Sequence, residues 1–562
     1  MTLGFVSLLM TNSIMLLAPK VLQRAIDALR LKVESRQLLL YAGMFLGITI
    51  AQGVFRYLVR QTVGVTSRRI EYDVRSDLYR HLQRLPLSYY HRMRTGDIMS
   101  RCTNDLQSVR NLLGPGIMYA LNAVIVFLAV LIIMLTMNVK LTLLSLVPMF
   151  ILPLFSNRFG KLMFDRSKQV QEQIALISGM AQESISGIRV VKAYGREANR
   201  YAQFRQASLD YVHKSMGLTK IEGILWPMMG LLSGLSSVIA LWYGGSRVIV
   251  SAMTLGELVA FQAYLLILMW PMMAIGWVVN MLQRGAASMG RICELLDTPP
   301  EIEDTSQTRE VQRIAGGIEF RHLTFAYDGR SVLRDITLKV EPGTTLAIIG
   351  PTGAGKSTLV NLIPRLFDPP PGTLFIDGVD VRHIPLHVLR RHIGCVPQDA
   401  FLFSRTIAQN IAYGILAATD EQVRQAAEVS QILKDVQEFP DQFDTMVGER
   451  GVTLSGGQKQ RTTISRAVIT DPRILILDDS LSSVDTYTEE AILTRLRTVM
   501  RGRTSLIVSH RISTIKDADW IIVLDDGRIV EQGTHDDLVA AGGLYASIYE
   551  KQLLTEALEQ VE

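Results

Sequence analysis

Two stretches of this chain, residues 224–245 and 258–279, are apolar from end to end and contain no charged residue. A helix needs about 20 consecutive apolar residues to cross a lipid bilayer, and both stretches meet that requirement. A helix buried in a large soluble core would instead show an amphipathic face and a shorter apolar run. The two stretches therefore predict a protein embedded in a membrane.

Four further apolar segments raise the expected number of membrane-spanning helices to six. They are residues 3–26, 38–55, 117–135 and 141–155. The last two flank a short polar turn and predict a helical hairpin. Met1 leads directly into the first segment, so we expect no cleaved signal peptide. A polar segment trimmed from the natural N-terminus would account for this start.

The distribution of basic residues orients these helices. Nine arginines lie between residues 62 and 112, and residues 159–220 are also rich in Lys and Arg. Such loops stay in the cytoplasm, so six spans place both termini on the cytoplasmic side of the cytoplasmic (inner) membrane. The predicted outer loop at 20–36 also carries five basic residues, which runs against this orientation; helices that extend past the bilayer would explain it.

We therefore attribute the net charge of +5 to the basic cytoplasmic loops of a membrane protein. A nucleic-acid partner is not expected, because the sequence has no basic patch interleaved with aromatic residues. The stretches 56–112 and 158–220 lack Gly and Pro over many residues, and they predict helices that continue into the cytoplasm. Turn-like breaks at 94–97 and 194–197 mark where each pair of helices turns back.

The second half of the chain carries a glycine-rich loop between a strand and a helix. Residues 345–349 form a short apolar run, and the next nine residues are Gly350, Pro351, Thr352, Gly353, Ala354, Gly355, Lys356, Ser357 and Thr358. In this context the backbone N–H groups of the loop close around phosphates at a helix N-terminus. Lys356 is expected to reach the β- and γ-phosphates and Ser357 to bind Mg²⁺. The loop therefore predicts ATP and Mg²⁺ as cofactors.

An acidic pair follows a second apolar run. Residues 474–477 are typical of a buried parallel strand, and Asp478 stands at its carboxyl end, where such sheets bind ligands. An acid at this place would hold Mg²⁺, usually through water. Alone, Asp478 could be a turn residue that ends the strand, but the glycine-rich loop upstream favours the metal-binding role. Asp479 comes directly after it.

The sequence LSGGQ at residues 454–458 narrows the family. With the two preceding motifs it makes the chain similar to ATP-binding cassette (ABC) exporters, specifically half-transporters with six spans fused to one ATPase domain. The resemblance covers essentially the whole length. It implies a six-helix, all-α transmembrane domain followed by an α/β P-loop ATPase domain. The expected divisions are a transmembrane domain at 1–284, a linker at 285–316, a nucleotide-binding domain at 317–552 and a tail at 553–562.

The resemblance also implies roles for further residues. Tyr327 would stack on adenine, and Gln398 would sense Mg²⁺ and the γ-phosphate and act in catalysis with the switch histidine His510. Residues 447–451 resemble the X-loop, and Asp485 ends a segment similar to the D-loop. Bends near 94–104 and 194–206 match the coupling helices. The signature residues bind the γ-phosphate of ATP held by the opposite subunit; they are Ser455, Gly456, Gly457 and Gln458.

Asp479 departs from the family pattern. The family has a glutamate here, which polarises the attacking water, and aspartate withdraws the carboxylate by about 1.5 Å. A misplacement of that size can cost about a hundredfold in rate. The chain thus resembles the degenerate-site subunit of bacterial heterodimeric multidrug or lipid exporters, whose partner carries the glutamate. The alternative is a homodimer in which Asp479 works more slowly.

The expected function is ATP-driven export of amphipathic or hydrophobic compounds such as drugs, lipids or peptides. The expected partners are a second half-transporter, membrane lipid and the transported small molecule. A homodimeric exporter or lipid flippase, an ATP-gated channel and a regulatory subunit share the same motifs and are kept as alternatives. Gln52 and Arg56 are polar positions in the second span, where they either face a cavity or, for Arg56, reach the inner interface.

Overall fold

The computed structural model describes residues 2–30, 35–309, 311–448, 451 and 453–559. The chain forms two compact units. The first, here called the helical unit, comprises Met1–Gln83 and Arg94–Thr298. The second, called the α/β unit, comprises Arg84–Met93 and Pro299–Glu562. The helical unit fits the predicted all-α domain, and the α/β unit fits the predicted α/β fold.

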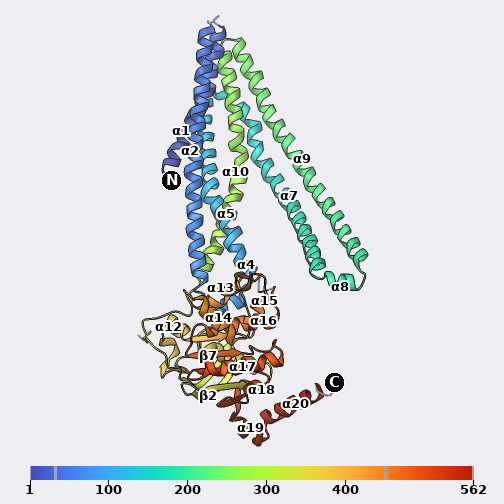
Figure 1. Ribbon diagram of the computed structural model, residues 1–562. Helices are drawn as coiled ribbons and strands as arrows, with labels where there is room; N and C mark the ends of the chain where they lie inside the picture. The colour runs from blue at the N-terminus through green and yellow to red at the C-terminus, as the bar shows by residue number, and fades with distance from the viewer. Residues whose placement is uncertain (1, 31–34, 310, 449–450, 452, 560–562) are drawn as a thin grey trace. The chain divides into compact units, whose positions relative to one another are not determined.

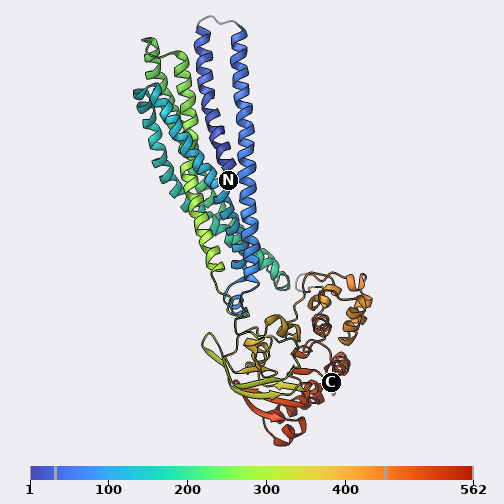
Figure 2. The same ribbon diagram turned by 90° about the vertical axis from the view of Figure 1, so that its left-hand side faces the viewer.

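Long helices make up the helical unit (Figure 1). They are α1 (Thr2–Arg30), α2 (Ser35–Leu82), α6 (Ile117–Met137), α7 (Val139–Ser186), α9 (Glu197–Ile249) and α10 (Leu255–Leu296). Shorter segments link α2 to α6: α4 (Thr95–Ser100), α5 (Leu106–Asn111) and two π-helical turns, η1 (Arg101–Asp105) and η2 (Leu112–Gly116). Helices α1 and α2 lie side by side as a hairpin (Figure 2).

Five helical segments among the described residues are long and apolar enough to cross a membrane. They are Thr2–Leu29, Ser35–Leu82, Thr95–Met137, Glu197–Ile249 and Leu255–Leu296. The other predicted span, 141–155, falls at the start of α7. The apolar segment described there, Val139–Ile151, is shorter than the five above. The side chains of residues 152–157 lie outside the described part of the chain.

The expected continuation of the spans as long helices is confirmed by α7 and α9, which run side by side and are joined by α8 (Ile188–Ala193) (Figure 1). Gln173 ties the two together: its Nε2 donates to the Ala207 carbonyl (2.9 Å), and its Oε1 accepts from Lys214 Nζ (2.8 Å). The short helix α8 precedes the break at 194–197, so it lies earlier than the bend expected at 194–206.

The linker predicted from residue 285 begins inside a helix, because α10 continues to Leu296. Its last turns pack against η1 through the buried carboxylate of Asp105. Ser288 Oγ donates to Asp105 Oδ1 and Arg291 Nε donates to Asp105 Oδ2, both at 2.9 Å. This long-range contact stabilises a segment whose composition alone suggested a linker.

The α/β unit is built on a six-stranded sheet of order β10-β9-β3-β8-β7-β6, parallel except for β10. The strands are β3 (Thr345–Ile349), β6 (Ile393–Val396), β7 (Ile474–Asp478), β8 (Thr504–Val508), β9 (Trp520–Asp525) and β10 (Arg528–Gly533). Every residue of β7 and β8 is buried, as expected for parallel strands covered on both faces.

Helices surround this sheet. They are α11 (Lys356–Leu362), α12 (Leu386–Arg391), α13 (Ile407–Ile411), α14 (Asp420–Val429), α15 (Leu433–Glu438), α16 (Gly456–Val468), α17 (Thr486–Met500), α18 (Ile512–Ile515), α19 (His535–Ala541) and α20 (Leu544–Glu559), with the 3₁₀ turns η3 (Val381–His383), η4 (Ala412–Gly414) and η5 (Gln442–Asp444). The tail predicted from residue 553 starts within α20, so that boundary also falls inside a helix.

A second, antiparallel sheet has the order β2-β1-β4-β5. Its strands are β1 (Ile318–Tyr327), β2 (Arg330–Val340), β4 (Leu374–Ile376) and β5 (Val379–Asp380). The segment Arg84–Met93, which contains α3 (Leu87–Arg92), belongs to this α/β unit. Arg84 pairs with Glu303 (2.7 Å) and Arg92 with Asp328 (3.0 Å). The segment Arg84–Met93 thus ends just before the bend predicted at 94–104.

Candidate functional site

The glycine-rich loop joins β3 to α11, as predicted. Gly355 has φ 97° directly before α11, in the left-handed region that favours glycine. Gly350 has φ 154°, and a Cβ there would meet the Leu524 carbonyl oxygen at 2.0 Å. Both positions therefore need glycine for the loop to turn against the neighbouring strands and direct its N–H groups inward.

Lys356 lies inside this loop. Its Nζ donates to the carbonyls of Gly350 (2.8 Å) and Pro351 (2.9 Å), and the side chain is buried. Burial lowers the pKa of the Lys356 ammonium, while the negative charges of Asp479 and Asp478 partly oppose that shift. A cation held in this place complements the phosphates that the loop is shaped to bind.

Asp478 and Ser357 offer two oxygen ligands side by side. Ser357 Oγ donates to Asp478 Oδ1 at 3.1 Å. Burial raises the pKa of the Asp478 carboxyl, the hydrogen bond from Ser357 lowers it, and the nearby Asp479 raises it further. Among the described residues no group of three His, Cys, Asp or Glu could hold a metal. The oxygen pair fits Mg²⁺, which takes few protein ligands and completes its shell with water and phosphate.

A raised pKa for Asp478 predicts that its charge costs stability in the nucleotide-free protein. The folded state binds the extra proton between the unfolded and the folded pKa, so stability falls as pH rises through that window. We expect Asp478→Asn to raise the melting temperature of the EDTA-treated protein at pH 7. A gain of about 1 kcal/mol would appear as about 2–4 °C in a domain of this size.

The gain should disappear at pH values below the unfolded pKa of the carboxyl. Asp525→Asn is the matched control, because Asp525 also ends a strand but is exposed; it should change the melting temperature little at either pH. A lower melting temperature for Asp478→Asn at pH 7 would contradict the prediction.

These groups line one cleft of about 280 Å³. The predicted site residues in its wall are Thr352, Gly353, Gly355, Lys356, Ser357, Thr358, Gln398, Asp478, Asp479 and His510. Gly350, Pro351 and Ala354 belong to the same loop but are not among the lining residues. The structure therefore brings together the phosphate-binding, metal-binding and catalytic residues predicted from separate parts of the sequence.

Asp479 has an unusual backbone conformation at the end of β7. Its φ is 46°, a left-handed value that Asp adopts more readily than most residues other than glycine. Its N–H donates to the Val508 carbonyl (2.9 Å), and its own carbonyl accepts from Ser482 Oγ (3.0 Å). The carboxylate is thus attached to a backbone fixed on both sides.

A glutamine of α20 holds the backbone at His510 and Ile512, and no sequence motif predicts this contact. Gln552 Nε2 donates to the His510 carbonyl, and the Ile512 N–H donates to Gln552 Oε1 (2.8 Å). Next to them, the buried Glu489 accepts hydrogen bonds from Arg511 and from Thr514 Oγ1 (2.6 Å). These contacts bridge tens of residues along the chain, so no local motif signals them.

The signature residues lie elsewhere in the α/β unit. Ser455 caps α16: the Gln458 N–H donates to Ser455 Oγ (3.2 Å), and Gln458 Oε1 accepts from the Ser455 N–H (2.9 Å). A Cβ on Gly457 would come within 3.0 Å of the Ser483 carbonyl oxygen. Gly456 and Gly457 therefore allow the loop after Asp479 to pass close to the start of α16.

Gln460 ties these two segments together. Its Nε2 donates to Ser482 Oγ (3.1 Å), and its Oε1 accepts from the Ser483 N–H (3.0 Å). Asp485 ends the same loop and caps α17 by accepting from the Thr488 N–H (2.9 Å). Neither the signature residues nor Asp485 are among the residues lining the cleft. One chain therefore does not bring its own signature to its own phosphate-binding loop.

Tyr327 is also absent from the cleft lining. It packs against Phe325 and Phe367, with ring centroids 5.0 Å away in each case. Tyr327 pairs with Arg330 across the β1–β2 hairpin, and Val332 on β2 lines the cleft. Its adenine contact remains a prediction. In the expected X-loop, residues 449 and 450 lie outside the described part of the chain.

Comparison with known proteins covers both units. Residues 1–272 match the family described as the ABC transporter transmembrane region, and residues 333–482 match the family described as ABC transporter. A probable multidrug resistance ABC transporter ATP-binding/permease protein, YheI of Bacillus subtilis, is 38% identical over 99% of this chain and 96% of its own length. The ATP-dependent lipid A-core flippase of Desulfotalea psychrophila is 35% identical over 91% of this chain and 89% of its own.

A solved structure shares the complete fold. The structure of a bacterial Atm1-family ABC exporter with ATP bound superimposes with a TM-score of 0.80 at 29% sequence identity. The match covers 98% of this chain and 97% of that one.

Proposed function

This chain belongs to the ATP-binding cassette (ABC) transporter family, and we propose that it is one half of a heterodimeric exporter whose own nucleotide site hydrolyses ATP poorly. The family assignment makes the chain an ATPase that couples hydrolysis to export across a membrane. Exporters with this architecture act as dimers. The proposal concerns the identity of the second chain, the rate of ATP hydrolysis at this chain's own site and the compounds that are transported.

One observation carries the heterodimer proposal: Asp479 stands in the cleft where the family has a glutamate. The carboxylate starts from a backbone held by Val508 and Ser482. The backbone therefore has little freedom to shift and compensate for a side chain that is one methylene shorter than glutamate. In this proposal the cleft binds Mg²⁺ and ATP through Lys356, Ser357 and Asp478 but activates water poorly.

The position of the signature supports the same division of labour. Ser455, Gly456, Gly457 and Gln458 are unaltered and lie apart from the cleft of their own chain. They are proposed to complete the site of a partner that has the glutamate. Two ATP molecules between the subunits would favour the closed pair over the open pair, and this difference in binding supplies the conformational work.

The proposed cargo is an amphipathic or hydrophobic compound, moved outward across the cytoplasmic membrane with the ATPase on the cytoplasmic side. Two of its relatives, a probable multidrug resistance transporter and a lipid A-core flippase, support this class. A homodimeric exporter is the second candidate. It is favoured by Lys356 and His510, which are both present and line the same cleft as Asp479.

The experiment is purification from the native membrane with a tag on this chain alone, followed by identification of the proteins that accompany it. The proposal expects a second ABC half-transporter with a glutamate after the aspartate that corresponds to Asp478. Inside-out vesicles containing the pair should take up a fluorescent lipid or dye when ATP is added. Uptake of equal rate by this chain alone would refute the heterodimer.

A further inference from the structure

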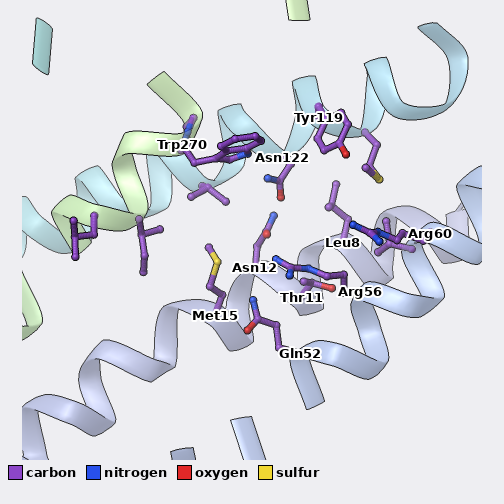
Figure 3. A pocket seen from close by; sticks show the side chains of 16 residues that line it. Leu8, Thr11, Asn12, Met15, Gln52, Arg56, Arg60, Tyr119, Asn122 and Trp270 are labelled. Atoms are coloured by element: carbon purple, nitrogen blue, oxygen red, sulfur yellow. The ribbon is translucent and has the colours of Figure 1, made fainter. Parts of the chain in front are cut away.

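A cavity of about 520 Å³ lies within the helical unit, between α1, α2, α6 and α10 (Figure 3). Asn12 and Arg56 face it from α1 and α2, and Asn122 and Trp270 face it from α6 and α10. This cavity is separate from the ATP cleft, which belongs to the other unit. Its wall combines charged, polar and aromatic side chains in a part of the chain that is otherwise strongly apolar.

The charge of the wall is positive. Arg56 and Arg60 are one helical turn apart on α2 and both line the cavity, and its lining contains no Asp or Glu. Within the described part of the chain, neither guanidinium makes a hydrogen bond or an ion pair with another residue. Both arginines are exposed, so their guanidinium groups are free to meet a ligand that supplies the negative charge.

The rest of the wall suits an amphiphile. Asn12 is 3% exposed, lines the cavity, and its Nδ2 has no hydrogen-bond partner. Asn122 adds a second amide. Trp270 and Met15 supply aromatic and flexible apolar surface to the same space. The cavity thus offers cations, free amide donors and an apolar wall side by side.

The depth of the arginines agrees with this arrangement. A helix rises about 1.5 Å per residue, which places Arg56 about 30 Å along α2 from its first residue, Ser35. The hydrocarbon core of a bilayer is also about 30 Å thick. If α2 enters near the outer face, Arg56 and Arg60 lie at the level of the inner headgroups, where an amphiphile can enter from the inner leaflet.

We propose that this cavity binds an anionic amphiphile, with its phosphate, sulfate or carboxylate group at Arg56 and Arg60 and its apolar body against Trp270 and Met15. The proposal rests on the export function proposed above and names its substrate class. Asn12 donates its free N–H to the same head group. The head can belong to a membrane lipid or to a soluble single-chain amphiphile, which share this chemistry.

The test measures binding to the full-length transporter in nanodiscs of phosphatidylcholine. The probes are decyl phosphate, decyltrimethylammonium and decyl maltoside, which share a chain and differ in the charge of the head. We expect decyl phosphate to bind most tightly, and each of Arg56→Gln and Arg60→Gln to weaken it about tenfold. Higher salt should weaken it as well, while decyl maltoside should respond to neither change.

Arg68→Gln is the matched control. Arg68 is on α2, exposed and without an ion pair among the described residues, but it does not line the cavity. Arg56→Lys keeps the charge and should retain part of the affinity, and melting temperatures verify that each variant folds. Equal weakening by Arg68→Gln, or equal binding of decyltrimethylammonium, overturns the proposal.

Two further measurements distinguish a lipid ligand from a soluble one, and the proposed binding site from the proposed export function. Phosphatidylglycerol in the nanodisc should displace decyl phosphate if the ligand is a lipid, and should leave it bound if the ligand is soluble; both results support an anionic site. Unchanged transport of every exported probe by the Arg56→Gln/Arg60→Gln variant overturns the site and leaves export standing. Charge-selective binding without any ATP-dependent transport supports the site and refutes the export function.

Discussion

The Asp479→Glu variant is expected to hydrolyse ATP at this chain's own site roughly ten- to a hundredfold faster than the natural chain. The added methylene moves the carboxylate toward the water position, and a displacement of about 1 Å can change a rate by about a hundredfold. Lys356, Ser357, Asp478 and His510 already line the same cleft. The variant therefore needs no second substitution to complete the catalytic residues of the cleft.

The measurement isolates this site within the assembled pair. In the proposed heterodimer, the catalytic glutamate of the second chain is first replaced by glutamine, so that the remaining turnover comes from the cleft of this chain. Asp479→Asn in the same background is the control and should lower turnover below that of the natural chain. Glutamate is less suited than aspartate to the left-handed backbone at this position, which should lower the melting temperature slightly. No gain in turnover would refute the idea that the shorter side chain limits hydrolysis.

The Gly457→Asp variant is expected to abolish most ATP hydrolysis by the pair, with a loss of about a hundredfold or more. The backbone N–H of residue 457 remains but is displaced, and loss of one preorganised donor to a transition state costs about 10²–10³ in rate. The change also places a negative charge near the γ-phosphate that the signature is proposed to bind. The new Cβ would lie 3.0 Å from the Ser483 carbonyl oxygen, so the loop after Asp479 would have to move.

Gly456→Ala is the matched control, because its Cβ would meet the nearest atom, Ser483 Cβ, at an ordinary 3.4 Å. It should keep most of the activity. The comparison with Asp479→Asn tests the division of labour: in a heterodimer, Gly457→Asp removes nearly all turnover of the pair and Asp479→Asn removes little. In a homodimer both changes remove turnover alike, which would contradict the proposal.

Much of the site could be predicted because its parts are local in the sequence. The strand, glycine-rich loop and helix at 345–362 follow each other directly, and Asp478 ends a run whose apolar residues require a buried strand. The apolar spans follow from composition in the same way. Each of these signals depends on residues a few positions apart.

The features that were missed depend on contacts between distant residues. Helix α10 continues past residue 284 because Asp105 binds Ser288 and Arg291. Gln552 reaches the His510 backbone from a helix whose last residues the sequence predicts to be a tail. The sequence also allowed two positions for Arg56, and only the packing of four helices places it at a cavity.

The contact of Gln552 with the His510 backbone couples α20 to the segment that carries the switch histidine, here called the switch loop. A fluorophore on an exposed residue of α20, such as Leu553, would move when ATP draws His510 toward the γ-phosphate. Such a label could report nucleotide-site closure in single transporters without any change to the ATP cleft. A fusion or truncation placed before Gln552, by contrast, would release the switch loop from this helix.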